Sequence, residues 1–260
     1  MPEAAERAWF IGEEGSVVMS MQIVLRSVFA FAAAVVFFTA LPAMAASPPV
    51  KHKGANADPA KRGSSPRTDG VGQAALADQL ARHADRARDV LAMIAAARML
   101  GQVSPRLVKH EIRTEGVAKP AAKSAAGASR DTSVAGLLAR ARQYAGGRHD
   151  LNQLIEEVAR TVAKGRKDGP ARAVNSLAVG IADVHTVQFN ANEPVMVALT
   201  GDGETDLDLA VEDEKGNRIC ASNSAVDVEI CSWTPKWTGA FRIRVHNVGP
   251  RASEYRLWSN

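Results

Sequence analysis

The sequence predicts an α+β chain built from several parts: a signal peptide, an α-helical segment with disordered linkers, and a C-terminal antiparallel β-sandwich of jelly-roll type. Three observations predict this organisation. An uncharged apolar run lies near the N-terminus, apolar residues then recur at three- and four-residue steps, and residues 181–260 alternate with a period of two. At 260 residues with 5% aromatic side chains, the chain has room for one large domain or two small ones.

Residues 1–45 predict a secretory signal peptide. Arg26 precedes an apolar run from Val28 to Leu41, and the small-residue triplet that ends at Ala45 provides a cleavage site. The alternative is an uncleaved membrane anchor, because an uncharged stretch of about 20 residues spans a bilayer. Residues 1–18 carry four glutamates where an export signal is normally positive, so we expect translation to start further downstream, at Met19 or Met21.

Export has two consequences for the mature chain. We expect a periplasmic or secreted protein that contacts a membrane only through the signal segment, if that segment stays uncleaved. The chain has two cysteines, Cys220 and Cys231, and in an oxidising compartment we expect them to form a disulfide. Such a short loop adds about 3 kcal/mol of stability through the unfolded state. Two free buried thiols are the alternative.

The segment after the signal peptide alternates between linkers and helices. Residues 46–72 are rich in Pro, Gly, Ser and Lys and predict a disordered basic linker. Residues 73–101 predict one amphipathic helix that ends at a glycine, and 102–130 lose the periodicity and predict a flexible linker. Residues 131–165 contain two short apolar stripes separated by a Gly-Gly pair, which predicts a helical hairpin.

The two halves of the mature chain differ in charge. Residues 46–180 hold 23 basic and 12 acidic side chains, a net charge of +11, whereas residues 181–260 hold 7 and 12, a net charge of −5. The basic half favours an anionic partner of the cell envelope, or its charges merely solvate linkers and helix faces. Export and the lack of interleaved aromatic residues argue against nucleic acid as a partner.

Residues 181–260 predict the sandwich domain. Short β-rich segments are separated by turn sequences such as Asp202-Gly203 and Gly249-Pro250, which is typical of an antiparallel sandwich. In the segment TDLDLAVED, residues two apart share a face, so the leucines are expected to point into the core and Asp206 and Asp208 to point outward. A solvated face explains these carboxylates without any chemistry.

Calcium is the alternative explanation for the acidic residues. Asp202, Asp206, Asp208 and Asp227 are candidate ligands if strands and loops bring them together, because Ca²⁺ prefers about six to eight hard oxygen ligands. Catalysis by a carboxylate pair is disfavoured, since nothing in the sequence separates the environments of the two groups.

Three ordered stretches resemble one known family. TDLDLAVEDEKGNRI, CSWTPKWTGAFRIRVHNVG and SEYRLWSN look like the bacterial pre-peptidase C-terminal domain, over about residues 181–260. The resemblance implies a non-catalytic β-sandwich, calcium-dependent in some members, whose acidic strand motif maps onto Asp206 and Asp208. The chain departs from the family in having Ala210 where an aromatic residue is usual and in having no protease upstream.

No motif predicts an enzyme. The six histidines have no zinc-ligand spacing, and neither a nucleophile elbow nor a phosphate-binding loop occurs. Trp233 and Trp237 are candidates for a binding platform, although such tryptophans more often complete a small core. The predicted function is an exported, non-catalytic binding or structural module that contacts protein or glycan of the bacterial envelope. The alternatives are a scaffold that binds anionic polymers through its basic half, and an accessory protein of a secreted hydrolase.

Overall fold

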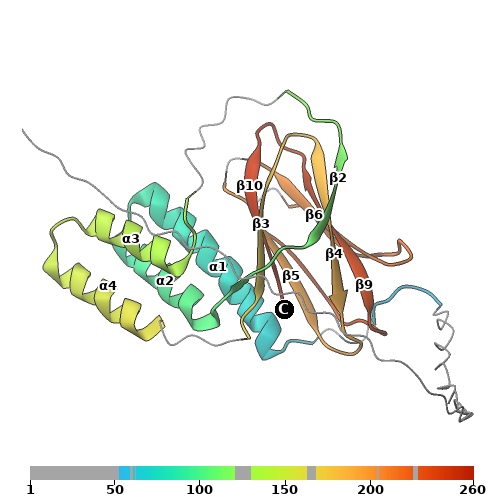
Figure 1. Ribbon diagram of the computed structural model, residues 1–260, viewed down its shortest axis with the longest axis horizontal. Coiled ribbons are helices and arrows are strands. Elements are labelled where there is room, and N and C mark those ends of the chain that lie inside the picture. Colours follow the sequence, from blue (N-terminus) through green and yellow to red (C-terminus); the bar gives the residue numbers. More distant parts are fainter. Residues whose placement is uncertain are drawn as a thin grey trace, which may run out of the picture. The chain divides into compact units, whose positions relative to one another are not determined.

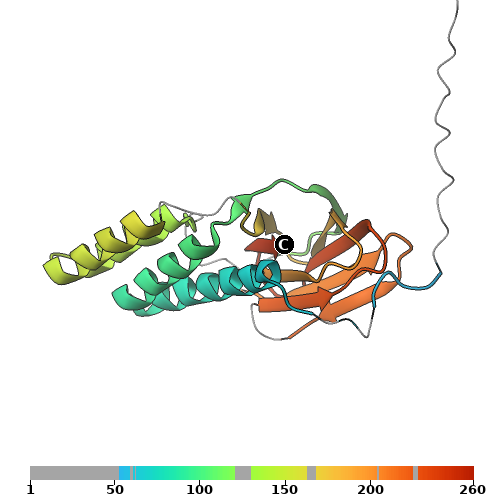
Figure 2. The same ribbon diagram turned by 90° about the horizontal axis from the view of Figure 1, so that it is seen from below.

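The computed structural model describes residues 53–58, 61, 63–120, 130–162, 168–203, 205–224 and 228–260. The predicted signal peptide lies outside these residues. Within residues 51–260, four helices lie beside two β-sheets (Figures 1 and 2). The helices are α1 (Pro66–Ala87), α2 (Val90–Val103), α3 (Val134–Ala145) and α4 (His149–Val162).

The strands form two five-stranded sheets that pack face to face. Sheet A has the strand order β1-β3-β10-β5-β8, and sheet B has the order β2-β4-β9-β6-β7. Every pairing is antiparallel except that of β1 with β3. The strands are β1 (Arg106–Leu107), β2 (Glu111–Gly116), β3 (Ala171–Leu177), β4 (Ile181–Phe189), β5 (Val195–Thr200), β6 (Leu207–Asp213), β7 (Arg218–Ser222), β8 (Val228–Trp233), β9 (Gly239–Asn247) and β10 (Ser253–Ser259).

The predicted inward leucines of β6 are confirmed. Leu207, Leu209 and Val211 are at most 1% exposed and lie in the core between the sheets, whereas Asp208 and Ala210 are only half-buried. Burying branched apolar side chains at every second position fixes the strand register, because a shift of one residue would turn all of them toward water.

The two cysteines form the predicted disulfide. Cys220 on β7 and Cys231 on β8 are joined, with a sequence separation of 11. Strand β7 is an edge of sheet B and β8 is an edge of sheet A. The bond therefore links the two sheets along one side of the sandwich.

The single helix predicted over 73–101 is wrong, because the structure has two helices there. Helix α1 starts earlier, at Pro66, where the Ser65 side chain caps the first turn. It ends at Ala87, and the next residue, Arg88, is its C-cap in a left-handed conformation. The Asp89 side chain then caps α2 by accepting a hydrogen bond from the Ala92 amide. The apolar period continues across the break because both helices face the same core, so periodicity alone did not reveal the turn.

The predicted hairpin over 131–165 is observed as α3 and α4, which pack on α2. Ser133 caps α3 and Gly146 ends it. At the contact of α2 with α4, a methyl group added to Gly101 would lie 2.3 Å from a methyl carbon of Val162. Only a glycine allows this close approach of the two helices.

The helices pack on the outer face of sheet A. Ala198 of β5 and Trp258 of β10 are buried in the same apolar core as α1, α2, α3 and α4. Between α1 and β10 lie two ion pairs that share Asp78, whose Oδ2 atom is 3.0 Å from Arg82 Nη1 and 3.6 Å from Arg256 Nη1. The result is a three-layer arrangement of helices, sheet A and sheet B.

The flexible linker predicted over 102–130 is in part β-structure. Strand β1 pairs with β3 at the edge of sheet A, and β2, six residues long, pairs with β4 at the edge of sheet B. This segment was missed because its side chains are largely exposed, and an edge strand needs backbone partners rather than an apolar pattern. The sandwich also starts before the predicted residue 181, since β3 begins at Ala171.

Part of the disordered linker predicted over 46–72 is also anchored. Asn56 is fully buried: its backbone N–H donates to Asp213, its amide group donates to the Trp237 carbonyl, and its side-chain oxygen accepts from the amides of Lys236 and Trp237. The Asp58 amide also donates to the Thr234 carbonyl at 2.9 Å, so long-range hydrogen bonds, most of them made by Asn56, hold this segment against the end of the sandwich.

Among the residues that the structure describes, none of the helices combines the length and the apolar character that a membrane span requires.

Replacing Gly101 by alanine should destabilise the protein by about 1–3 kcal/mol, because the new methyl group overlaps Val162 and forces α2 and α4 apart. Denaturant unfolding monitored by circular dichroism measures this loss. Gly147→Ala is the matched control, since a methyl group there meets no atom within 4 Å. Equal stability of the two variants would contradict the close helix packing.

Candidate functional site

The acidic residues of β6 lie at its N-terminal end and on the outer face of sheet B. Asp208 pairs with His246 of β9 in the sheet register. The carbonyl oxygen of Asp206 accepts hydrogen bonds from the amides of Val248 and Gly249, which fixes the entry to the strand. The register confirms that Asp208 lies on the opposite face from the core leucines.

The electrostatics of this end of β6 are unfavourable for a negative charge. Partial burial raises the pKa of Asp208, the nearby Asp206 and Glu229 raise it further, and His246 lowers it. Asp206 Oδ1 is buried without a hydrogen-bond partner. A carboxylate oxygen without a partner next to a second carboxylate is a location where a bound cation would relieve repulsion.

The other predicted calcium ligands are not all available. Asp202 accepts hydrogen bonds from Ser253 Oγ at 2.8 Å and the Glu254 amide at 3.0 Å, so its side chain holds the start of β10. Asp227 lies outside the described residues. Within the described part of the chain, no three His, Cys, Asp or Glu side chains are grouped so that they could hold a metal ion.

Glu229 is a further carboxylate near this end of β6. It lies on β8, faces the sandwich interior and is fully buried. The hydroxyl groups of Ser222 and Ser224 and the Ser224 amide donate hydrogen bonds to it. These donors satisfy its oxygens within the protein.

The structure does not support a binding platform built from both tryptophans. Trp233 is 5% exposed and packs edge-on against Phe189 in the core, so its ring is unavailable to a ligand. Trp237 is half-buried, its indole N–H donates to Glu214, and the Lys215 ammonium lies 4.9 Å from its ring centroid. The structural role anticipated for such tryptophans therefore holds for Trp233.

A buried polar network inside the sandwich was not predicted. Asp183 and His185 on β4 point between the sheets toward Tyr255 on β10, and all three side chains are at most 3% exposed. His185 Nε2 lies 2.7 Å from the Tyr255 hydroxyl, which donates to Asp183 Oδ2 at 2.8 Å. The sequence contained a signal for this network, because the period-two alternation of β4 places Asp183 and His185 on the inner face of the strand.

Two further elements complete this network. The Thr114 hydroxyl on β2 donates to Asp183 Oδ1 at 2.8 Å, and the Asn175 amide on β3 donates to Asp183 Oδ2 at 3.0 Å. His110, in the connection between β1 and β2, places its Nδ1 atom 3.2 Å from Nδ1 of His185. The network thus joins β2, β3, β4 and β10 to the connection between β1 and β2.

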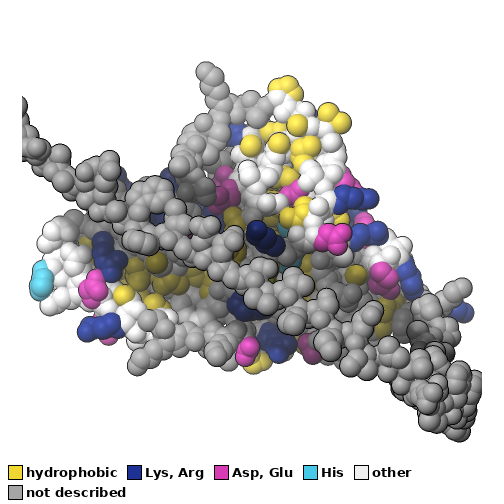
Figure 3. Space-filling view, viewed as in Figure 1, with side chains coloured by type: hydrophobic (Ala, Val, Ile, Leu, Met, Phe, Trp, Pro, Cys, Tyr) yellow, Lys and Arg dark blue, Asp and Glu magenta, His cyan; other side chains and the backbone are white. Residues whose placement is uncertain are grey.

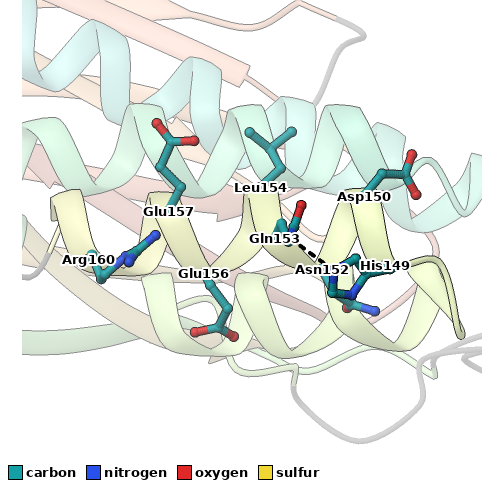
Figure 4. Close-up of a pocket in the computed structure, with 8 residues that line it drawn as sticks. All are labelled: His149, Asp150, Asn152, Gln153, Leu154, Glu156, Glu157 and Arg160. Atoms are coloured by element: carbon teal, nitrogen blue, oxygen red, sulfur yellow. Dashed lines mark hydrogen bonds between the residues drawn. The ribbon is translucent and has the colours of Figure 1, made fainter.

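A surface hollow lies along the outer side of α4 (Figure 4). All eight residues that line it lie between His149 and Arg160 of this one helix, and seven of them are polar. The side chains point away from the helix in several directions rather than toward one point (Figure 4). This hollow has the character of an ordinary solvated helix face.

The outer face of sheet B carries alternating charges. Basic and acidic side chains lie side by side where β2, β4 and β9 run (Figure 3). Glu115 pairs with both Arg113 and Arg244, and Glu212 pairs with Arg218 and Arg242. None of the helices that the structure describes shares an apolar core with this face.

Stability should fall as the pH is lowered from about 7 to 4, because burial, with His110 adding to it and Asp183 opposing it, lowers the pKa of His185 from 6.5 to about 4. Below pH 6.5, His185 binds a proton in the unfolded chain but stays neutral in the folded chain. Acidification therefore lowers the free energy of unfolding, by at most about 3 kcal/mol. Chemical denaturation across this range should show the loss.

The slope should become shallower in His185→Gln, whose side chain does not titrate. His83→Gln alters an exposed histidine on α1 and should keep the native slope. A pH-independent free energy of unfolding between pH 4 and 7 would rule out a buried neutral His185.

No model of a known protein family matches the chain, and no curated protein matches it by sequence. One solved structure with similarity to this chain is the pre-peptidase C-terminal domain of collagenase from Bacillus anthracis. The two sequences are 12% identical, the match covers 35% of this chain and 89% of that chain, and the TM-score is 0.31. The periplasmic inhibitor of g-type lysozyme from Aeromonas hydrophila has 13% identity, 35% and 84% coverage and a TM-score of 0.28. At these identities and TM-scores, the similarities do not assign the chain to a family.

Proposed function

We propose that the chain is an exported, non-catalytic binding or structural module of the bacterial cell envelope, and that it binds its partner through the outer face of sheet B. The observation that carries this proposal is the unequal covering of the two sheets. The helices that the structure describes bury the outer face of sheet A, and none of these helices shares an apolar core with the outer face of sheet B.

The chemistry of this face favours a protein partner over a glycan. Its side chains form ion pairs between neighbouring strands. Charged side chains of a protein partner can replace one member of such a pair and form an ion pair across the interface. Glycan recognition usually needs an exposed aromatic ring, and Trp237 has its ring beside Lys215 and its N–H on Glu214. The charged face consists of Glu111, Arg113, Glu115, Asp208, Glu212, Arg218, Arg242, Arg244 and His246.

Export is supported by the disulfide between Cys220 and Cys231, since such bonds persist in oxidising compartments. The bond links the edges of the two sheets and so belongs to the folded core rather than to a surface loop.

Calcium is proposed as a ligand of the same face. Asp206 Oδ1 lacks a partner, and the pKa of Asp208 is raised by burial and by its acidic neighbours. Hard oxygen ligands of this kind suit Ca²⁺, with water molecules and Asp227 as the further ligands.

The Asp208→Asn variant separates the two roles of this carboxylate. In chelator, its melting temperature at pH 7 should exceed that of the native chain, because a raised folded-state pKa means that the ionised group opposes folding. Calcium should raise the melting temperature of the native chain and have a smaller effect on the variant. Calorimetry detecting no calcium heat for the native chain would remove the metal from the proposal.

Reversing charges at Arg242→Glu and Arg244→Glu should abolish salt-sensitive capture of an envelope protein by the full chain, because both side chains lie on the charged face. Pull-down from an envelope fraction at two salt concentrations measures this. Arg160→Glu on α4 is the matched control and should capture the partner normally. Equal capture by all variants would show that the partner binds elsewhere.

A further inference from the structure

The pair of histidines at the edge of the sandwich faces nitrogen to nitrogen. His110 Nδ1 and His185 Nδ1 are 3.2 Å apart, and the two rings are mutually perpendicular with centroids 5.3 Å apart. His185 is fully buried, whereas His110 is partly exposed in the connection between β1 and β2. One nitrogen is therefore fixed within the sandwich and the other lies nearer to the solvent.

The hydrogen-bond network assigns the tautomer of His185. The Asp183 carboxylate can only accept, so the Tyr255 hydroxyl donates its proton to Oδ2. The Tyr255 oxygen is then the acceptor for His185 Nε2, which must carry the ring proton. As a result, His185 Nδ1 bears a lone pair that points at His110.

From this geometry we propose that His110 and His185 bind a divalent transition-metal ion of the zinc, copper and nickel class through their Nδ1 atoms. Two nitrogen ligands at tetrahedral angles around zinc, each about 2.0–2.1 Å from the ion, are about 3.3–3.4 Å apart. The observed separation of 3.2 Å requires only a small adjustment. Neutral imidazole is a preferred ligand of this class of ions.

The remaining side chains form the outer support that histidine ligands need. A metal-bound histidine usually donates its second ring N–H to a carboxylate or another acceptor, which orients the ring. Here Tyr255 accepts from His185 and relays to Asp183, which Thr114 and Asn175 hold in place. Tyr255 is a positioning residue and does not itself contact the ion.

Binding leaves the proton count unchanged. In the metal-free protein, His110 Nδ1 carries a proton and donates it to His185 Nδ1. When the ion binds, that proton leaves Nδ1, and His110 is protonated at Nε2 instead, so both rings stay neutral. Two ligands from the described part of the chain face the ion, so water or a group of another molecule completes its coordination.

Zinc titration of the chelator-treated full chain tests the proposal, using calorimetry for affinity and circular dichroism for folding. The native chain should bind one zinc ion at this pair. His110→Ala should weaken that binding at least tenfold, and Tyr255→Phe should weaken it about 10- to 100-fold. The control His83→Ala, an exposed histidine on α1, should bind like the native chain. Absence of zinc binding by the native chain, or unchanged binding by His110→Ala, would overturn the proposal.

Nitrogen-15 spectra of the histidine rings give an independent readout in the native chain. Without metal, His185 should be protonated at Nε2 and unprotonated at Nδ1, and zinc should shift the Nδ1 signals of His110 and His185. Protonation of His185 at Nδ1, or zinc-induced shifts confined to other histidines, would show that the pair is only a hydrogen bond. This result is independent of calcium and of the charged face.

Discussion

Strand β10 is buried on both of its faces, and the rest of the architecture depends on this. Tyr255 and Leu257 point into the sandwich, and Trp258 points the other way, with each of the three at most 1% exposed. A strand with large apolar side chains on both faces needs a layer on each side, because exposing either face would leave a large apolar surface in water. Helix α1 provides the second layer, and α2, α3 and α4 pack behind it.

The contact between α1 and β10 also contains charge. Asp78, Arg82 and Arg256 lie together at this contact, and the guanidinium groups of both arginines also donate to the Gly201 carbonyl. Buried ion pairs add little net stability, yet breaking one leaves an unpaired buried charge. These three charged side chains therefore favour one position of α1 on sheet A over other positions that would bury a similar apolar area.

The two sides of the sandwich are closed by different chemistry. A disulfide joins β7 to β8 on one side, while on the other side the chain runs from β1 in sheet A to β2 in sheet B. On that second side, Asp183, His185 and Tyr255 replace apolar packing with hydrogen bonds between the sheets. A polar network whose members are all hydrogen-bonded favours one unique arrangement of the two sheets. His110 is its partly exposed member.

The sequence alone determined the local features. The period-two pattern located the core leucines of β6, and the apolar stripes located α3 and α4. The cysteine count, together with the expectation of export, predicted the disulfide. These properties depend on residues near one another in the chain or on simple pairing. The acidic motif was placed correctly on an outer face, but the availability of Asp202 was not, because its donors belong to β10.

Only the tertiary structure decided the features that join distant segments. Arg106–Leu107 and Glu111–Gly116 carry no apolar pattern, and they become strands because β3 and β4 offer unpaired backbone groups. The chain turns at Arg88 so that α1 and α2 can both pack on one core. Asn56 is held by residues more than 150 positions away in the sequence. The approach of His110 to His185, across 75 residues, has the same origin. Long-range hydrogen bonds and shared burial are properties of the folded chain, and a local pattern does not record them.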